Sequence, residues 1–193
     1  VILAKIETTY GTDPVPTAAA NAILCSAPEI DVAGKRLERE NTKSTYGARL
    51  GVNIGEGLNI KFTTELKGYG AAGTAPEIGV LHRACNFTET IVVSTSVTYD
   101  PNSNADTGES ITIYFYRHNI LHKVSGCRGS FNVELKSGEY GKINWTFQGL
   151  YQGPADGTIP AGTYNATIPP RFISAAFAID SYAAIIESLK VDV

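Results

Sequence analysis

Three histidines and three cysteines are the residues of this chain best suited to bind a metal or act as nucleophiles. His82 and Cys85 stand three residues apart, His118 and His122 stand four apart, and Cys127 follows. Imidazole and thiolate groups are the usual ligands of tetrahedral zinc. However, the second histidine pair straddles an expected hairpin tip, and Cys85 falls in an apolar stripe, where a thiol behaves as a small hydrophobe. We therefore expect core and surface residues here, with neither a zinc site nor a Cys–His nucleophile.

Two carboxylates, Glu65 and Glu134, could lie opposite each other on neighbouring strands, as the paired acids of a glycosidase do. Each has a lysine close by in the sequence, Lys61 for the first and Lys136 for the second. Exposed carboxylates beside lysines are usually solvated ion pairs. We expect the same here, and a hydrolase that uses these carboxylates is only the third hypothesis.

The glycine spacing Gly68-x-Gly70-x-x-Gly73 matches the dinucleotide-binding fingerprint. That fingerprint requires a strand–turn–helix unit within a parallel sheet. The surroundings here are expected to be antiparallel strands with one short helix, and the chain carries no P-loop and no Gly-x-Ser-x-Gly elbow. The sequence therefore predicts no cofactor and no enzymatic activity.

The composition is that of one globular domain. Of the 193 residues, 43% are hydrophobic and 18% are charged, which is too apolar for a disordered chain. Sixteen basic and 19 acidic residues give a net charge of −3, which argues against a dedicated nucleic-acid binder. No apolar run approaches the roughly 20 residues of a membrane helix, so no membrane insertion is expected. Three widely spaced cysteines predict reduced thiols in a product made in the cytoplasm.

The alternation of residue types predicts a mainly β fold. Residues 58–66 alternate cleanly between apolar and polar side chains, as a half-buried strand does. Residues 76–87 are expected to form one short amphipathic helix, since Pro76 suits a first helical position. Further strands are expected at 23–32, 88–99, 110–116, 120–126, 130–136, 142–148, 172–179 and 185–193, with a loop at 152–170. This order predicts an antiparallel β-sandwich or barrel with one short packed α-helix, in a single domain over residues 23–193. The abrupt end at Val193 looks like a cut, which predicts a C-terminal continuation that is missing from this sequence.

Three of the expected strands, 58–66, 130–136 and 142–148, each combine an apolar face with a polar face. The polar faces contain no aromatic residue, which argues against stacking sites for single-stranded nucleic acid or sugars. Such faces suit either plain solvent or the lining of a wide aqueous channel. Their residues are Asn59, Lys61, Thr63, Glu65, Ser130, Asn132, Glu134, Lys136, Lys142, Asn144, Thr146 and Gln148.

Residues 33–57 are expected to form a long loop rich in charge and glycine. Residues 33–50 carry five basic and two acidic side chains, a net +3, so the remainder of the chain carries −6. A structureless stretch of about 25 residues inside a compact domain suggests a function. It is either a solvated surface loop or a loop that becomes ordered on a complementary acidic surface. Its charged residues are Lys35, Arg36, Glu38, Arg39, Glu40, Lys43 and Arg49.

Residues 1–22 are expected to form an N-terminal arm. Pro14 and Pro16 closely follow Gly11, and proline is incompatible with a helix interior or a central strand. An arm of this kind becomes ordered only against a surface, which can belong to its own chain or to a neighbour.

Three sequence blocks, in this order along the chain, carry a family resemblance. The first runs from Lys5 through Tyr10-Gly11-Thr12-Asp13-Pro14 to Leu24, the second from Glu65 through Pro76-Glu77-Ile78-Gly79 to Cys85, and the third from Tyr114 through His122-Lys123-Val124-Ser125-Gly126 to Gly129. Together with the intervening strands they span most of residues 3–151. These blocks resemble the tail tube (major tail) proteins of long-tailed bacteriophages.

The resemblance implies a structural subunit of the virion tail that is assembled in the host cytoplasm. In that family a β-sandwich or barrel core with one packed helix forms hexameric rings, which stack into a tube that conducts DNA. The resemblance also implies that the loop 33–57 and the arm, with Tyr10, Asp13 and Pro14, contact neighbouring subunits. The implied partners are other copies of the chain, a tape-measure protein, tail-tip and tail-terminator proteins, and phage DNA in transit without sequence-specific binding.

One feature departs from the expectation for a DNA channel, which should be negative inside. The expected polar faces carry Lys61, Lys136 and Lys142 against Glu65 and Glu134. Either the strand register is wrong by one residue, which would turn every side chain to the other face, or other loops supply acidic groups.

An alternative function is a carbohydrate- or protein-binding β-sandwich module of a viral or surface appendage. Its candidate contacts are Tyr114, Tyr116, Tyr140, Trp145 and Tyr151. Aromatic side chains more often pack in cores and interfaces, and this hypothesis therefore ranks second.

Overall fold

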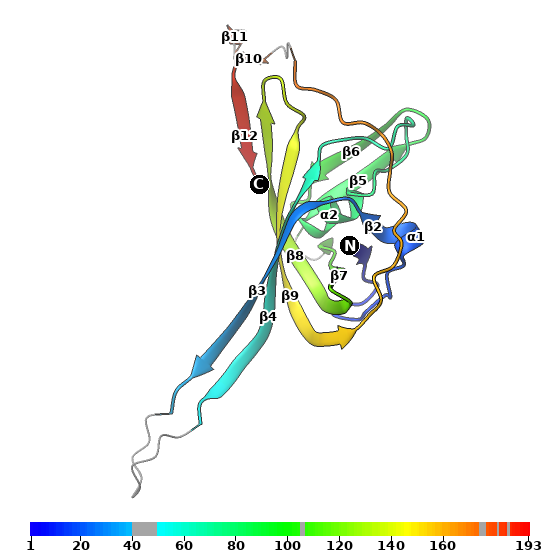
Figure 1. Ribbon diagram of the computed structural model, residues 1–193. Helices are drawn as coiled ribbons and strands as arrows, with labels where there is room; N and C mark the ends of the chain where they lie inside the picture. Colours follow the sequence, from blue (N-terminus) through cyan, green and yellow to red (C-terminus); the bar gives the residue numbers. More distant parts are fainter. Residues whose placement is uncertain (40–49, 105–106, 174–176, 181, 185) are drawn as a thin grey trace, which may run out of the picture.

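A large antiparallel sheet dominates the computed structural model, which describes residues 1–39, 50–104, 107–173, 177–180, 182–184 and 186–193. Over these residues, eight strands form the sheet in the order β2-β1-β7-β8-β9-β4-β3, with β12 paired to β8 (Figure 1). The strands of the large sheet are β1 (Ile2–Ile6), β2 (Ala22–Ile23), β3 (Ser26–Leu37), β4 (Val52–Glu65), β7 (Ile111–Arg117), β8 (Ile120–Lys136), β9 (Lys142–Asp156) and β12 (Ser188–Asp192). The described part also contains two separate hairpins and two short helices. The hairpins are β5 (Phe87–Val92) with β6 (Ser96–Pro101) and β10 (Phe177–Ile179) with β11 (Tyr182–Ala184). The helices are α1 (Ala18–Asn21) and α2 (Gly79–Ala84).

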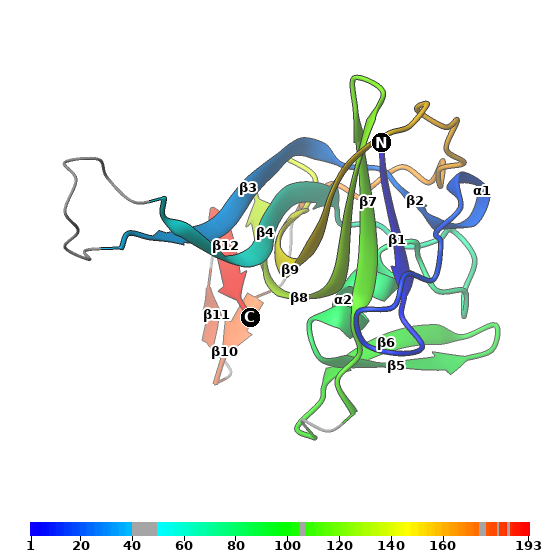
Figure 2. The same cartoon turned by 90° about the horizontal axis from the view of Figure 1, so that it is seen from below.

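The main core lies between the curved sheet and α2. Leu58 and Ile60 of β4 and Trp145 of β9 are almost completely buried, and they belong to one apolar cluster with Leu81 of α2. Figure 2 shows α2 between the sheet and the β5–β6 hairpin. The helix therefore closes one side of the sheet, as its amphipathic pattern requires.

A second, smaller cluster packs on the other side of β1 and β7, where Leu3, Ala22, Tyr114 and Leu121 are buried. The extended segment 157–171, called the strap below, runs along this side of the molecule beside α1 (Figure 1). It is fastened by backbone hydrogen bonds from Gly157 to Asn119 and from Thr163 to Ala18. The strap thereby covers apolar side chains that the main core does not use.

The predicted mainly β fold is confirmed, although the sheet does not close into a barrel. The predicted helix exists but is limited to Gly79–Ala84, because a turn at Pro76–Ile78 precedes it and β5 begins at Phe87. The predicted strand 88–99 is wrong: it is a hairpin whose turn places Ser94 at a positive φ of 56°. The predicted loop at 152–170 begins too early, since β9 continues to Asp156.

Two larger predictions also need correction. The loop predicted over 33–57 is a β-hairpin at both described ends, because β3 continues to Leu37 and β4 starts at Val52. Pairing between β3 and β4 satisfies the backbone groups on the facing edges of these strands, although nearly all side chains of β3 stay exposed. The arm predicted over 1–22 is largely part of the domain, since β1 pairs with both β2 and β7 and its Ile2 is fully buried. The prolines that suggested an arm follow this strand.

A buried hydrogen bond joins β4 and β9 and can be tested. The indole Nε1–H of Trp145 donates to Oγ1 of Thr64 over 2.9 Å, and both side chains are buried. Replacing Thr64 by Val keeps the shape but leaves the donor unsatisfied, so we expect unfolding free energy to fall by about 2 kcal/mol. Thr146→Val, on the exposed side of β9, is the matched control and should change it by less than about 0.5 kcal/mol. Urea denaturation of the two variants measures both values, and equal stabilities would contradict the assigned bond.

Candidate functional site

The twelve residues of the predicted polar faces lie together on one side of the sheet. Leu58, Ile60 and Phe62 are buried on the opposite side, so the predicted register of β4 is right. The strand pairing aligns the polar residues in rows across β4, β9 and β8. The rows are Asn59–Gln148–Arg128, Lys61–Thr146–Ser130, Thr63–Asn144–Asn132 and Glu65–Lys142–Glu134. The twelve predicted residues together with Arg128 form one continuous surface, called the polar face.

A hydrogen-bonded row crosses the middle of the polar face. Thr63 Oγ1 donates to Asn144 Oδ1 over 2.7 Å, and Asn144 Nδ2 donates to Asn132 Oδ1 over 2.9 Å. These neutral groups satisfy one another side by side across three strands. The centre of the face is therefore polar without offering a cluster of charges.

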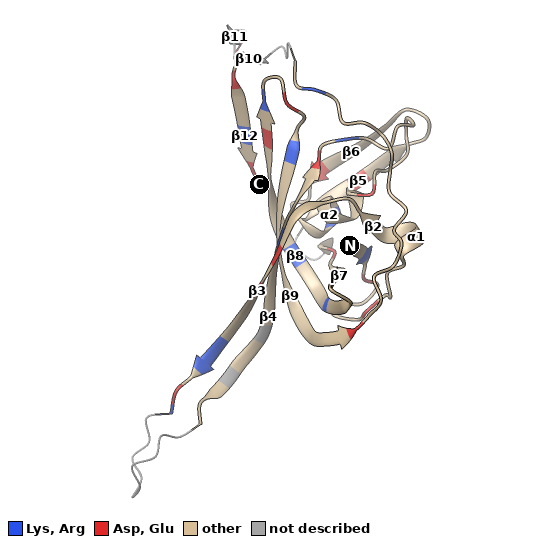
Figure 3. Cartoon of the chain, in the orientation of Figure 1, with Lys and Arg blue, Asp and Glu red and all other residues tan. Residues whose placement is uncertain are grey.

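Acidic groups reach the polar face from its flanking strands. Glu29 and Asp31 of β3 pair with Lys61 and Asn59, and Asp192 of β12 pairs with Asn132. The register is thus not shifted, and strands supply the additional acids. Among the described residues of the face, five acidic side chains (Glu29, Asp31, Glu65, Glu134 and Asp192) balance five basic ones (Lys61, Arg128, Lys136, Lys142 and Lys190). Figure 3 shows blue and red segments interspersed along these strands.

The β3–β4 hairpin leaves the body of the molecule beyond the pair Ala33–Gly57, where pairing of β4 with β9 ends. This projecting hairpin, described at residues 34–39 and 50–56, points away from the end that carries β10 and β11 (Figure 1). Lys35, Arg36, Glu38 and Arg39 lie on its exposed described part, whereas Glu40, Lys43 and Arg49 lie outside the described residues. Its exposed apolar side chains are Leu37, Leu50, Val52 and Ile54. A basic, partly apolar projection of this kind is suited to dock on another surface.

Asp13 and Pro14 of the predicted arm make contacts within the chain. The carboxylate of Asp13 accepts hydrogen bonds from the Tyr114 hydroxyl, the Val15 N–H and the Lys123 ammonium group. Burial alone would raise the pKa of Asp13, but these three donors hold it below its usual value. Lys5 Nζ donates to the Pro14 carbonyl over 2.9 Å. Residues 13–15 are thus tied to β1, β7 and β8 of the same chain.

Tyr10 lies over the backbone of Gly126, where an added Cβ would come within 2.9 Å of its ring. The Arg128 guanidinium lies 5.6 Å from the ring centroid, within the range of a cation–π contact. Tyr10 nevertheless keeps 59% of its surface exposed. A contact of this residue with a neighbouring subunit remains a prediction.

Glu7 is a buried carboxylate that sequence reasoning missed. Its two oxygens accept hydrogen bonds from Ser110 Oγ and Thr112 Oγ1, both over 2.6 Å, and from the N–H groups of Gly126 at 2.7 Å and Gly11 at 2.8 Å. Burial would raise the pKa of Glu7, but the four donors together hold it below the ordinary value of 4.5. This carboxylate joins the end of β1 to β7, β8 and the following turn. No local sequence pattern marks it, because three of its partners are more than 100 residues away.

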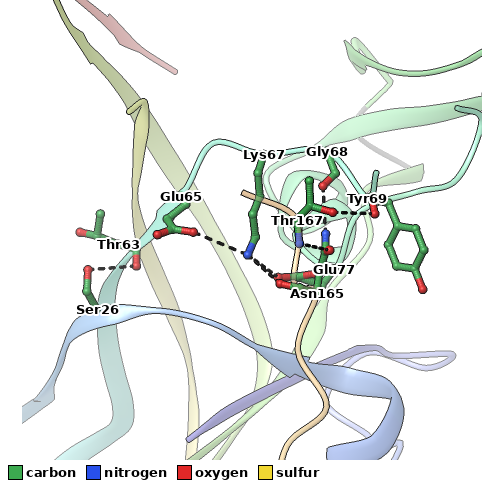
Figure 4. Close-up of polar contacts among 9 residues, drawn as sticks. All are labelled: Ser26, Thr63, Glu65, Lys67, Gly68, Tyr69, Glu77, Asn165 and Thr167. Carbon is green, nitrogen blue, oxygen red and sulfur yellow. Dashed lines mark hydrogen bonds and ion pairs between the residues drawn. The ribbon is translucent and has the colours of Figure 1, made fainter. Parts of the chain in front are cut away.

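A second buried charge fastens the strap to the body (Figure 4). Lys67 Nζ donates to the Asn165 carbonyl over 3.0 Å and lies 3.6 Å from Glu65 and 3.8 Å from Glu77. Asn165 Nδ2 in turn donates to the Gly68 carbonyl. Burial raises the pKa of Glu77, and the nearby ammonium group opposes that shift. This cluster holds the strap, the end of β4 and the start of α2 in one arrangement.

The residues considered for chemistry are placed apart. His82 packs in the core against the rings of Tyr99, Phe131 and Trp145, and its burial lowers its pKa to about 4. Within the described ranges, no three His, Cys, Asp or Glu side chains gather as a metal-binding group. Glu65 and Glu134 are not direct neighbours, since Lys142 lies between them in the same row.

The aromatic residues of the alternative binding hypothesis share no exposed face. Trp145 and Tyr114 are buried, and Tyr116 and Tyr151 are half-buried. Tyr140 is 42% exposed and lies beyond the end of β8. Stacking on a sugar or a base requires several accessible rings along one surface, which these positions do not provide. None of the helices in the described part of the chain is long and apolar enough to cross a membrane.

Comparison with known families identifies the class to which this fold belongs. A family profile described as phage tail tube protein matches residues 1–191. The match covers nearly the whole chain, so the chain belongs to the phage tail tube protein family, as the sequence blocks predicted. It is therefore a structural, non-enzymatic component of the virion tail that assembles with other copies of itself. A search of curated proteins found no match.

The Glu7 network predicts a pH dependence of stability. A carboxylate whose pKa is lowered by folding stabilises the folded state fully above its unfolded pKa, and this contribution is lost as the pH falls through the folded pKa. We expect Glu7→Gln to lower the free energy of unfolding at pH 7 by about 2 kcal/mol. Below pH 4.5, the free energy of unfolding of this variant should fall less steeply with decreasing pH than that of the wild type. Glu134→Gln, at an exposed position, is the control. Denaturation series between acidic and neutral pH measure this, and parallel curves for wild type and Glu7→Gln would contradict the assignment.

Proposed function

We propose that six copies of this chain close into a ring, that rings stack into a tail tube, and that the polar face lines a channel for phage DNA. The observation that carries the proposal is the two-sided character of β4, β9 and β8. One side is buried in the core, while the other presents a broad polar surface. Ring closure with this surface inward would give a wide polar channel.

The chemistry of the polar face suits DNA in transit. Tight binding to phosphates needs clustered lysines and arginines that release counterions. Here each basic side chain has an acidic residue in its own row or in the next, as Lys142 has between Glu65 and Glu134. Amide and hydroxyl groups fill the centre. Such a lining lets a polyanion pass without trapping it and without reading its sequence.

An open edge of the sheet supports ring closure. β3 is twelve residues long, almost entirely exposed, and pairs with β4 alone among the described strands. A long unpaired edge strand is a template for pairing with another chain. Closure of copies into a ring would remove this edge.

The projecting hairpin supports stacking of rings. It carries Lys35, Arg36 and Arg39 at one end of the molecule, whereas exposed Asp180 and Glu187 lie near β10–β12 at the opposite end (Figures 1 and 3). Head-to-tail contacts between unlike surfaces produce open filaments. In the assembled tail, the tube would surround a tape-measure protein and end against tail-tip and tail-terminator proteins.

Removal of the projecting hairpin should separate folding from assembly. We expect a variant in which a two-residue Asn-Gly turn replaces residues 34–56 to remain folded, because the described residues of this segment belong to neither core cluster. Thermal unfolding measures whether the variant is folded. Electron microscopy should show no tubes, even when tail-tip complexes are added as seeds.

Paired charge variants refine that test. Lys35→Glu with Arg36→Glu should weaken stacking, whereas Lys35→Arg with Arg36→Lys preserves the charge and should assemble normally. Tubes of ordinary length from the variant lacking residues 34–56 would show that the hairpin is not a stacking contact.

Labelling of a single cysteine tests which face lines the channel. Thr146, exposed in the middle of the polar face, is changed to Cys, and Thr98→Cys on β6 behind the core is the matched control. A bulky polyethylene-glycol maleimide should modify Thr146→Cys in monomers but not in tubes, and should modify Thr98→Cys in both. The native chain serves as a blank, since burial raises the pKa of Cys25 to about 11 and of Cys85 to about 12, and Cys127 is buried. Equal modification of Thr146→Cys in tubes and monomers would place the polar face outside.

A further inference from the structure

The edge of β8 is covered by two different strands along its length. β7 pairs with the first part of β8, from Ile120 to Cys127. β12 pairs with the last part, from Ser188 opposite Lys136 to Asp192 opposite Asn132. Four of the five residues of β12 are exposed, and it supplies no described side chain to either buried cluster. The cover at this end of β8 is therefore thin and held mainly by backbone pairing.

The direction of the strands distinguishes β12 from the rest of the polar sheet. β3, β4, β9, β8 and β12 are antiparallel in that order, so β12 runs in the same direction as β3. Rotation about a ring axis keeps strand direction, so β3 of the next copy also runs that way. A ring joined from β12 to β3 would have a parallel seam, whereas a ring joined from β8 to β3 would be antiparallel throughout. Antiparallel pairing is the slightly more stable of the two.

β12 also has the residue pattern of β3. Both strands contain a five-residue run with apolar side chains at the second and fourth positions. The runs are Ser188-Leu189-Lys190-Val191-Asp192 in β12 and Glu29-Ile30-Asp31-Val32-Ala33 in β3. In each strand the first, third and fifth residues lie on the polar face. A strand with the direction and alternation of β3 can thus occupy the same edge of β8 without turning its side chains to the wrong face.

We propose that β12 is a removable cover of the β8 edge, and that β3 of a second copy displaces it when the ring closes. This inference rests on the proposed ring and names the edge through which its subunits join. In the unassembled chain β12 blocks edge-to-edge aggregation at β8. Its competitor has twelve residues where β12 has five, so the ring can form a longer ladder than it breaks.

The chain segment that links the strap to β12 explains how so short a strand can protect the edge of β8. The chain is anchored directly after the strap at Phe172, whose N–H donates to the Glu139 carbonyl and whose carbonyl accepts from the Gly138 N–H. Residues 173–187 join this anchor to β12, which keeps β12 at a high effective concentration beside β8. Release of β12 leaves the anchor and both core clusters intact. Each free subunit would accordingly be competent for assembly only in the fraction of time for which β12 is detached.

A disulfide that locks β12 in place tests the proposal. The N–H groups of Val193 and Ser137 donate to the carbonyls of Phe131 and Glu187, which makes the pair Glu134–Lys190 one of the non-hydrogen-bonded pairs. Such pairs bring Cα atoms to about 4.5 Å, within the range of a disulfide. The double variant Glu134→Cys with Lys190→Cys should assemble in reductant and remain monomeric after oxidation. The single variant Lys190→Cys controls for loss of the lysine and for oxidation itself.

A second variant acts in the opposite direction. Leu189→Pro with Val191→Pro removes N–H groups that pair with β8, because these residues occupy hydrogen-bonded pairs. We expect β12 to detach and the critical concentration for seeded tube growth to fall about tenfold. Thermal unfolding should stay close to that of the wild type. The matched control places prolines at Lys190 and Asp192, which occupy non-hydrogen-bonded pairs, so their N–H groups do not donate to β8.

The outcomes separate this proposal from the proposed function. If the oxidised double-cysteine variant forms tubes as the wild type does, strand displacement is overturned, but the proposed ring is not. Failure of the folded double-proline variant to assemble would do the same, since β12 would then be needed on β8. Absence of tubes from wild-type chains with competent seeds would overturn both. Two results together support the displacement: the double-cysteine variant assembles only when reduced, and the double-proline variant assembles at a lower critical concentration than the wild type.

Discussion

The whole structure depends on a sheet that is apolar on one side and polar on the other. Side chains such as Leu58, Ile60 and Trp145 are almost completely buried against α2 and its neighbours, and burial of each contributes about 1.5–3 kcal/mol. The side chains between them in the sequence stay half-exposed or exposed. The same alternation that forms the core therefore also forms the polar face. A substitution that shifted the register by one residue would exchange the two faces and destroy both.

The remaining parts of the chain cover the apolar side of this sheet and determine which of its edges stay open. Glu7 and Lys67 are buried charges that fix the N-terminal segment and the strap, so that two clusters become covered without a second large sheet. The edges are treated differently, since β3 is long and open while the far part of β8 is covered by five residues of β12. A monomer that keeps one open and one thinly covered edge is suited to associate with copies of itself. Family membership agrees with this reading of the edges.

The sequence was sufficient for features that depend on local alternation and insufficient for features that depend on distant partners. The register of β4, β8 and β9, and hence the twelve polar-face residues, follows from period-two patterning alone. The hairpin within 33–57 was missed because its strands carry mostly exposed polar side chains, and backbone pairing leaves no mark in such a pattern. β1 was missed because Pro14 and Pro16 dominated the interpretation of residues 1–22. The Glu7 network and the pairing of β12 with β8 join residues far apart in the chain, which no spacing rule relates.

The most direct test of the central claim is a cryo-electron-microscopy reconstruction of tubes grown from the purified chain on tail-tip complexes. We expect stacked six-fold rings in which Asn59, Thr146 and Asn132 face the channel and the core side with α2 faces outward. A reconstruction with these side chains on the outer surface or inside a subunit contact would contradict it. Chains that remain monomeric in the presence of competent seeds would contradict it as well.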